Sequence, residues 1–185
     1  QSKRSKVPSL LENKWEYLSK TLLMIKKNLL NDFFIFITIF LIDRLSKFYV
    51  IFLNEKNNGL QIYSSKFLNI ELYWNSGIAF GLFSFSENNL YNYMTLLIVL
   101  VILVIVAMTL KSKDFTKLAL LIILGGAIGN LFDRIIYKSV PDFIDIHFGD
   151  FHWFIFNVAD IFISLGVIFM ILIEIIGKKR KNNEV

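Results

Sequence analysis

The stretch FIFNVADIFISLGVIFMILIEII, from Phe154 to Ile176, decides the fold of this 185-residue chain. It is long and apolar enough for a transmembrane helix, because about 20 residues span a bilayer core of about 30 Å. Yet its first turns carry Asn157 and Asp160. An ionisable group inside a membrane helix costs about 2.5–3.5 kcal/mol on insertion scales, so Asp160 indicates a partner or a function.

Three further apolar segments have a similar length, at 33–53, 94–110 and 118–136. Hydrophobic residues make up 55% of the chain, more than is typical of a soluble domain. The runs are continuously apolar rather than alternating, which favours helices over a membrane barrel. The sequence therefore predicts an all-α integral membrane protein with four transmembrane helices, at 33–53, 94–110, 118–136 and 154–176.

The distribution of positive charge predicts the orientation in the membrane. Seven of the 20 Lys and Arg residues precede residue 33, and others gather at 111–117 and 178–181. The segments 54–93 and 137–153 contain few. By the positive-inside rule, both termini and the middle loop are cytoplasmic, and the other two loops face outward. The basic patches favour contact with anionic lipid rather than nucleic acid.

Composition also limits which chemistry the chain can perform and indicates how it divides into domains. The chain has no Cys and two His, so no disulfide or thiolate site can form, and we expect no metal and no cofactor. Residues 31–178 are predicted to form one membrane domain, followed by a basic tail at 179–185. Residues 1–30 fit a basic amphipathic helix on the cytoplasmic membrane surface, with a partly disordered extension as the alternative.

The first outward loop carries a strand-like pattern. Leu68, Ile70 and Leu72 alternate with polar or larger residues, as in a half-buried strand. Gly77, a little further on, permits a bend or a close backbone approach. We expect a small sheet at about 60–85, resting on the outer membrane surface.

Two more spans carry polar residues. Asp43 and Lys47 are four residues apart, so they share a helix face and could pair. A structural pair or a Lys that reaches the interface is the favoured interpretation for Lys47. Asn130 shares a helix face with Asp133 and Arg134, which follow it by three and four residues. Asp133 and Arg134 could equally form an interfacial polar cluster with no part in a functional site.

Asn157 and Asp160 are three residues apart and should face the same way. Asp160 is expected about 9 Å from the start of a helix at Phe154, at about 1.5 Å per residue, where the helix dipole explains it poorly. The preceding VPDFIDIHFGDFHW offers the further carboxylates Asp142, Asp145 and Asp150. Two carboxylates that share a proton can activate water for attack on a peptide carbonyl without a metal. The residues alone do not choose between Asp142 and Asp145.

Five sequence blocks occur in order along residues 40–165. They are DRLSK at 43–47, NSGIAFG at 75–81, GNLFDR at 129–134, VPDF at 140–143 and FNVAD at 156–160. In these blocks the chain resembles the lipoprotein signal peptidase family, also called type II signal peptidases.

The resemblance implies an aspartyl endopeptidase of the bacterial inner membrane, with its active site toward the outer face. Its substrate would be a prolipoprotein with a diacylglyceryl-modified Cys, cut just before that Cys, and it would be inhibited by globomycin. By position, the catalytic pair falls on Asp142 and Asp160. Residues matching the family's substrate-binding and supporting positions are Asn75, Gly77, Asn130, Arg134, Asn157, Asp43 and Lys47, the last two with a structural role. A mobile outward helix or loop is expected within 60–85 or 138–152, and a monomer is expected.

Two alternatives belong to other classes of protein. A proton-coupled transporter also uses membrane carboxylates, but these usually lie near mid-bilayer and accompany inverted repeats. Here the carboxylates cluster toward the outer side and no repeat is evident. A non-catalytic lipid or signal-peptide binder is the second alternative.

Overall fold

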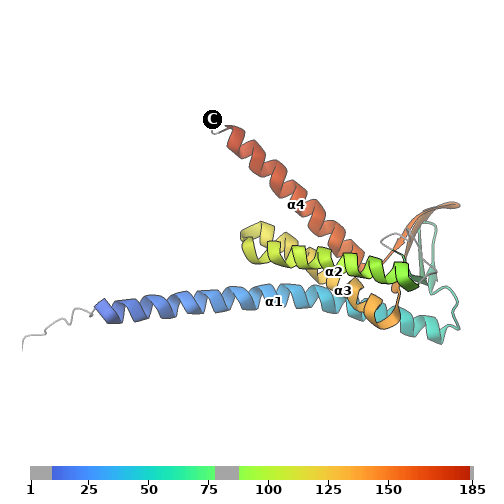
Figure 1. Cartoon of the computed structure of the whole chain (residues 1–185). Coiled ribbons are helices and arrows are strands. Elements are labelled where there is room, and N and C mark those ends of the chain that lie inside the picture. The colour runs from blue at the N-terminus through green and yellow to red at the C-terminus, as the bar shows by residue number, and fades with distance from the viewer. Residues whose placement is uncertain (1–9, 78–87, 184–185) are drawn as a thin grey trace, which may run out of the picture. The chain divides into compact units, whose positions relative to one another are not determined.

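A computed structural model describes residues 10–77 and 88–183 of the chain (Figure 1). Its elements, in chain order, are α1 (Leu10–Lys56), β1 (Tyr63–Ser64), β2 (Leu68–Asn75), α2 (Asn88–Lys111), α3 (Asp114–Tyr137), β3 (Val140–Phe148), β4 (Phe151–Phe156) and α4 (Val158–Asn183). The chain divides into two units, Gln1–Phe34 and Ile35–Val185. The smaller unit contains the first part of α1, which is helical from Leu10. The membrane-surface location of residues 1–30 stays a prediction.

Three helices of the described residues are long and apolar enough to cross a membrane. They are Tyr91–Lys111, Asp114–Tyr137 and Val158–Lys178. They correspond to the predicted spans 94–110, 118–136 and 154–176. The predicted span 33–53 lies within α1, but it contains Asp43, Arg44 and Lys47 and is not among the three.

The predicted start of the last span is wrong by four residues. Phe154 belongs to strand β4, and α4 begins only at Val158. Asp160 therefore lies in the first turn of α4, not about 9 Å along it. A run of aromatic and aliphatic residues fits a buried strand as well as a helix, and pairing with β3 decides in favour of the strand.

Helix α3 packs against both α2 and α4, and glycines allow the close approach. A Cβ at Gly126 would lie 2.6 Å from the carbonyl oxygen of Ala159 in α4. From the other side, a Cβ at Gly166 would lie 2.5 Å from the side chain of Ile123. Small residues at such contacts let helix backbones approach closely, as is common between membrane helices.

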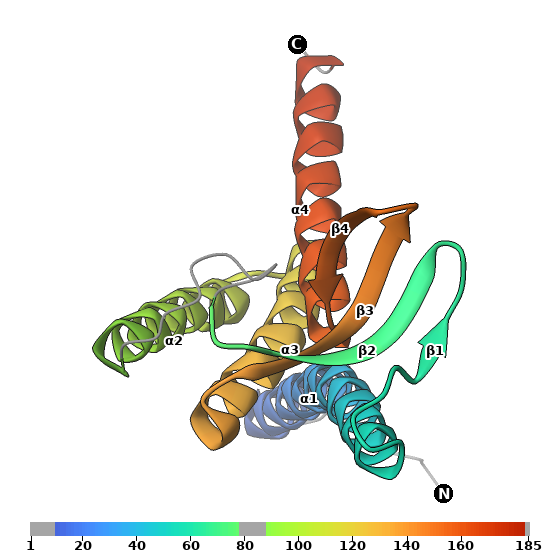
Figure 2. The same ribbon diagram turned by 90° about the vertical axis from the view of Figure 1, so that its right-hand side faces the viewer.

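The four strands form one antiparallel sheet in the order β1-β2-β3-β4. Figure 2 shows this sheet at the end of the helices where α4 begins. The prediction of a small sheet is confirmed, but half of its strands come from 140–156. An outward helix or loop was expected at 138–152, and the last span was expected to begin at 154. The reason is that VPDFIDIHF pairs with β2 along most of its length. Residues 78–87, also part of the expected outward region, lie outside the described residues.

Candidate active site

The start of α4 is closed by two reciprocal hydrogen bonds between Asn157 and Asp160. The backbone N–H of Asp160 donates to Asn157 Oδ1 at 3.2 Å, and the backbone N–H of Asn157 donates to Asp160 Oδ2 at 3.1 Å. This is a capping box, which satisfies two N–H groups that a helix start leaves without partners. Asn157 is fully buried and Asp160 is 7% exposed.

Strand β3 brings Asp142 to the same place. Its side chain is 3% exposed and accepts two hydrogen bonds from amides. Asn157 Nδ2 donates to Asp142 Oδ1 at 2.6 Å, and Asn75 Nδ2, from the end of β2, donates to Asp142 Oδ2 at 2.8 Å. Asn157 therefore binds two buried carboxylates from different elements, Asp142 through its side-chain NH₂ and Asp160 through its backbone N–H.

A third amide completes the surroundings of the carboxylates. Asn130 Nδ2 donates to Asp160 Oδ1 at 2.8 Å. In all three amides the side-chain oxygen accepts a hydrogen bond from a group that can only donate. This group is a backbone N–H for Asn75 and Asn157, and the Lys47 ammonium for Asn130. Each amide therefore has to turn its NH₂ group toward a carboxylate. The three amides therefore favour the charged form of the carboxylates that they bind.

A neutral group of four charged residues, called here the charge cluster, supports the site from α1 and α3. Arg44 and Lys47 each bind both Asp43 and Asp133. The Lys47 ammonium lies 3.0 Å from Asp43 and 2.7 Å from Asp133. The predicted Asp43–Lys47 pair is thus present. From the sequence, Asp133 was considered only as part of an interfacial polar cluster, and Arg44 was given no role. Their contact joins residues 89 positions apart, so it leaves no local pattern.

The charge cluster also reaches the first turn of α4. Asp43 Oδ1 accepts the backbone N–H of Ala159 at 3.0 Å. Lys47 donates to Asn130 Oδ1 at 2.7 Å, and Asn130 in turn donates to Asp160. Asp43 thus binds the residue next to Asp160, and Lys47 binds the amide that donates to Asp160.

Arg134 lies at the end of α3 nearest the sheet. Its side chain is 6% exposed, and Nη2 donates to the carbonyl oxygen of Gly77 at 2.6 Å. The hydroxyl of Tyr91, from α2, donates to the carbonyl oxygen of Arg134 at 3.0 Å. Arg134 thus fixes the chain just after β2, two residues from Asn75.

Asp145 does not lie with the carboxylate pair of Asp142 and Asp160. It binds His152 across the β3–β4 hairpin, at 2.8 and 2.9 Å from His152 Nδ1. The structure therefore brings Asp142, and not Asp145, together with Asp160. The third carboxylate of this segment, Asp150, lies in the exposed turn between β3 and β4.

The environment changes the acidity of Asp142. Burial raises the pKa of its carboxyl group from 3.8 to about 6, and the nearby charge of Asp160 adds to the effect. The hydrogen bonds from Asn157 and Asn75 act in the opposite direction, because they favour the charged form. Burial therefore outweighs the hydrogen bonds, and Asp142 stays protonated to a higher pH than an exposed aspartate does.

A cavity of about 270 Å³ opens beside Asp160. Its lining comes from the end of β4 and the first turns of α4, and comprises Phe156, Asp160, Ile161, Ser164 and Leu165. The wall is mainly apolar, and Asp160 is its acidic residue. A ligand there would place an apolar part against α4 and a polar part at Asp160.

Solved structures with a similar fold are bacterial membrane enzymes. One, determined by the in meso method at 2.3 Å resolution, has a TM-score of 0.65 and 24% sequence identity, and covers 82% of this chain and 90% of its own. A second, determined by the same method at 1.9 Å, has a TM-score of 0.63 and 23% identity, and covers 77% and 90%. The fold is thus one that bacterial membrane enzymes adopt.

Sequence comparison identifies the family. The family model described as Signal peptidase (SPase) II matches residues 35–176. The lipoprotein signal peptidase of Pelagibacter ubique (strain HTCC1062) is 48% identical over 158 residues, which are 85% of this chain and 95% of the relative. That of Anaplasma phagocytophilum (strain HZ) is 38% identical over 143 residues, 76% and 89%. The chain belongs to the signal peptidase II family and is a bacterial membrane protein.

Proposed function

We propose that this protein is an aspartyl endopeptidase that removes signal peptides from prolipoproteins, cleaving before a diacylglyceryl-modified Cys. Asp142 and Asp160 form the catalytic pair. The observation that carries the proposal is that one buried residue, Asn157, binds both carboxylates, Asp142 through its side-chain NH₂ and Asp160 through its backbone N–H. Asn157 lies at the sheet end of a helix long enough to cross the membrane.

The carboxylate pair activates a water molecule. One aspartate removes a proton from the water as its oxygen attacks the peptide carbonyl, and the other, protonated, donates to the carbonyl oxygen. The C–N bond of the tetrahedral intermediate then breaks, and the leaving nitrogen takes up the proton that the first aspartate removed from the water. The raised pKa of Asp142 favours a pair that shares one proton near neutral pH, so the titration belongs to the pair.

The apolar cavity beside Asp160 supports a lipid-modified substrate. The diacylglyceryl chains approach from the bilayer and pack along α4, which brings the adjacent peptide bond to the carboxylates. Asn75, at the end of β2, and Gly77 lie where an extended signal peptide would meet the site. The same site would bind a globomycin-type inhibitor in competition with the substrate.

We further propose that α1 supplies the fourth membrane span, at about 33–53. Its charges do not prevent this, because Arg44 and Lys47 are neutralised by Asp43 and Asp133 within the charge cluster. Charged residues in membrane helices are tolerated when they pair and face the bundle interior. Both termini are then cytoplasmic, and the sheet and carboxylate pair face outward.

The direct test is cleavage of a defined diacylglyceryl-modified prolipoprotein by purified protein in detergent. Asp142→Asn and Asp160→Asn should each lower the turnover by at least about 10²–10⁴-fold, the usual contribution of an acid–base group. Asp150→Asn, in the exposed hairpin turn, removes the same charge outside the site and should cleave normally.

Near-normal turnover in either site variant would exclude the carboxylate pair. An intact protein that binds the substrate without cleaving it would indicate the non-catalytic binder instead. Substrate binding should survive Asp142→Asn, because the lipid chains contact α4 and not β3, and an inhibitor displacement assay measures this separately from turnover.

A further inference from the structure

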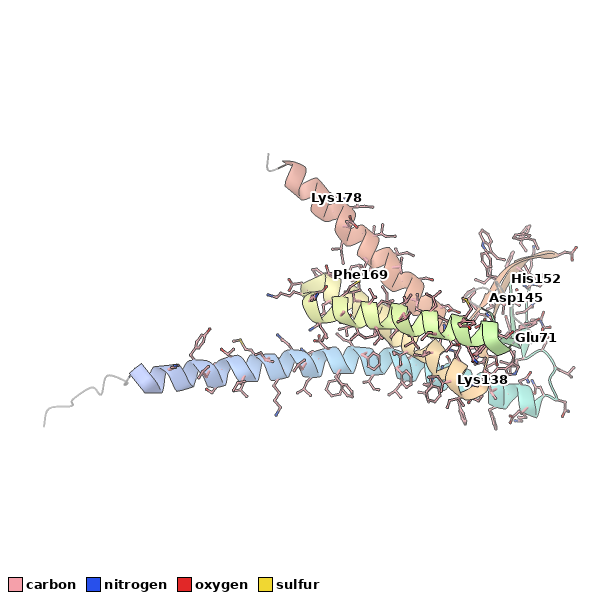
Figure 3. The ribbon with its side chains drawn as sticks, viewed as in Figure 1. Glu71, Lys138, Asp145, His152, Phe169 and Lys178 are labelled. Atoms are coloured by element: carbon pink, nitrogen blue, oxygen red, sulfur yellow. The ribbon has the colours of Figure 1, made fainter. Side chains whose placement is uncertain are left out.

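A second group of polar side chains lies on the β3–β4 hairpin, apart from the carboxylate pair. Asp145, His147 and His152 each offer a metal-binding atom, and these atoms lie within 4.8 Å of one another. His147 and His152 are direct cross-strand partners, with ring centroids 5.1 Å apart. Figure 3 shows Asp145 and His152 together on the sheet.

One atom of this group is unsatisfied. His147 Nδ1 is buried and has no hydrogen-bond partner in the part of the chain that the structure describes. A buried polar atom without a partner costs about 1–3 kcal/mol, and such atoms often mark an unseen water or ion. The backbone around it is fixed, since the N–H of His147 donates to the carbonyl oxygen of Phe67 at 3.1 Å.

The donor set fits a divalent transition-metal ion of the zinc type. Two imidazoles and one carboxylate are a usual set for tetrahedral Zn²⁺, with one position left for water. Oxygen-only ligands, which Ca²⁺ and Mg²⁺ prefer, are not what this group offers. Ligand atoms around a tetrahedral ion are about 3.3 Å apart at bond lengths of about 2.0 Å, so the three side chains would have to adjust slightly to close around the ion.

The surroundings favour a cation. Asn69 Nδ2 donates to Asp145 Oδ2 at 3.2 Å, and such outer contacts orient metal-binding carboxylates.

We propose that Asp145, His147 and His152 bind one zinc-type divalent ion that ties β3 to β4. The ion would brace the hairpin whose two strands carry Asp142 and lead into Asn157. Asp142 and Asp160 are not ligands, so the ion has a structural role and takes no part in bond cleavage. The proposal does not rest on the proposed peptidase activity.

Metal binding can be measured directly on the full-length protein, purified without a histidine tag and freed of metal. Titration with Co²⁺, followed by its visible absorption, should show saturable binding of one tetrahedral ion per chain, and Zn²⁺ should displace it. His152→Ala and His147→Ala should weaken binding by at least about 10–100-fold, the loss seen even for outer-contact variants. Asp150→Asn, at the turn of the same hairpin, should bind normally.

Thermal unfolding gives a second readout. Zn²⁺ should raise the unfolding midpoint of the unmodified protein and leave that of His152→Ala unchanged. His152 is exposed, so its removal should not prevent folding. Absence of saturable binding, or equal binding by His152→Ala, would overturn the proposal and leave Asp145–His152 as a hydrogen-bonded pair. Loss of metal binding in Asp142→Asn would place the ion at the carboxylate pair and would also overturn the proposal.

Discussion

Asn157 carries two tasks in one side chain. Its oxygen caps α4 by accepting the N–H of Asp160, and its nitrogen donates to Asp142. Because it is fully buried, water cannot replace either bond. The residue therefore links the beginning of a helix to the charge state of a carboxylate on another element.

Two substitutions separate these tasks. Asn157→Ala removes both bonds and should lower the free energy of unfolding by about 0.5–2 kcal/mol, the usual value of an N-cap. Asn157→Ser keeps an oxygen that can cap the helix but loses the donor to Asp142. We expect Asn157→Ser to unfold near the normal midpoint while both variants cleave poorly, as measured by thermal unfolding in detergent and by peptide cleavage. Equal destabilisation by Ser and Ala would argue against the capping role.

The raised pKa of Asp142 predicts how stability depends on pH. Between 3.8, its ordinary pKa, and about 6, the folded protein holds this proton more tightly than the unfolded chain does. The contribution of Asp142 to the free energy of unfolding must therefore fall as pH rises through that window. Asp142→Asn should abolish this contribution. As the pH rises through the window, the unfolding midpoint of Asp142→Asn should therefore rise relative to that of the unmodified protein. Parallel profiles for the two proteins would contradict the raised pKa.

The candidate site could be predicted from the sequence only in part. FNVAD pointed to Asn157 and Asp160 because polar groups stand out in an apolar run. The residues alone did not decide whether Asp142 or Asp145 pairs with Asp160, because 140–148 was expected to be a connection rather than a strand. In a regular strand, positions three apart point to opposite faces, so recognising β3 would have separated them. Arg44 and Asp133 were missed as a bound pair, because a contact across 89 positions leaves no local pattern.

At the level of elements, hydropathy predicted the helices better than their ends. The predicted spans 94–110 and 118–136 fall inside α2 and α3. The last span was placed too early because FIF, at 154–156, is as apolar as the helix that follows it. Only its partner strand, β3, shows that this segment is extended, and pairing across a hairpin is not visible in hydropathy.

The contact of α3 with α4 gives a prediction for glycine. A Cβ at Gly126 would strike the backbone oxygen of Ala159, which is held because the Ala159 N–H binds Asp43. Gly126→Ala should therefore destabilise the protein by about 1–3 kcal/mol, as overpacking does. Thermal unfolding in detergent measures this loss.

Gly177 supplies the matched control on α4. Nothing lies within 4 Å of a Cβ built there, so Gly177→Ala meets no obstacle. Because Ala favours a helix over Gly by about 1 kcal/mol, Gly177→Ala should leave the stability equal or higher. A similar loss in both variants would show that helix packing is not the cause.

For the whole molecule, the orientation in the membrane is the main untested prediction. The natural absence of Cys allows single-Cys labelling without further substitutions. Gln61→Cys, in the exposed segment before β1, should react with an impermeant maleimide on intact cells. Ser112→Cys, in the turn between α2 and α3, should react only after the membrane is opened. Labelling of both sites on intact cells, or of Ser112→Cys alone, would contradict cytoplasmic termini and an outward carboxylate pair.

The β3–β4 hairpin turns at Gly149, whose φ is +59°, and nothing lies within 4 Å of a Cβ there. The flanking partners Phe148 and Phe151 close the ladder before the turn. Insertions at exposed tips of this kind are usually tolerated, because no buried backbone is disturbed. The tip between Gly149 and Asp150 is therefore a suitable point for grafting an epitope or a fluorophore. A reporter there would follow the hairpin during turnover without touching the reacting groups.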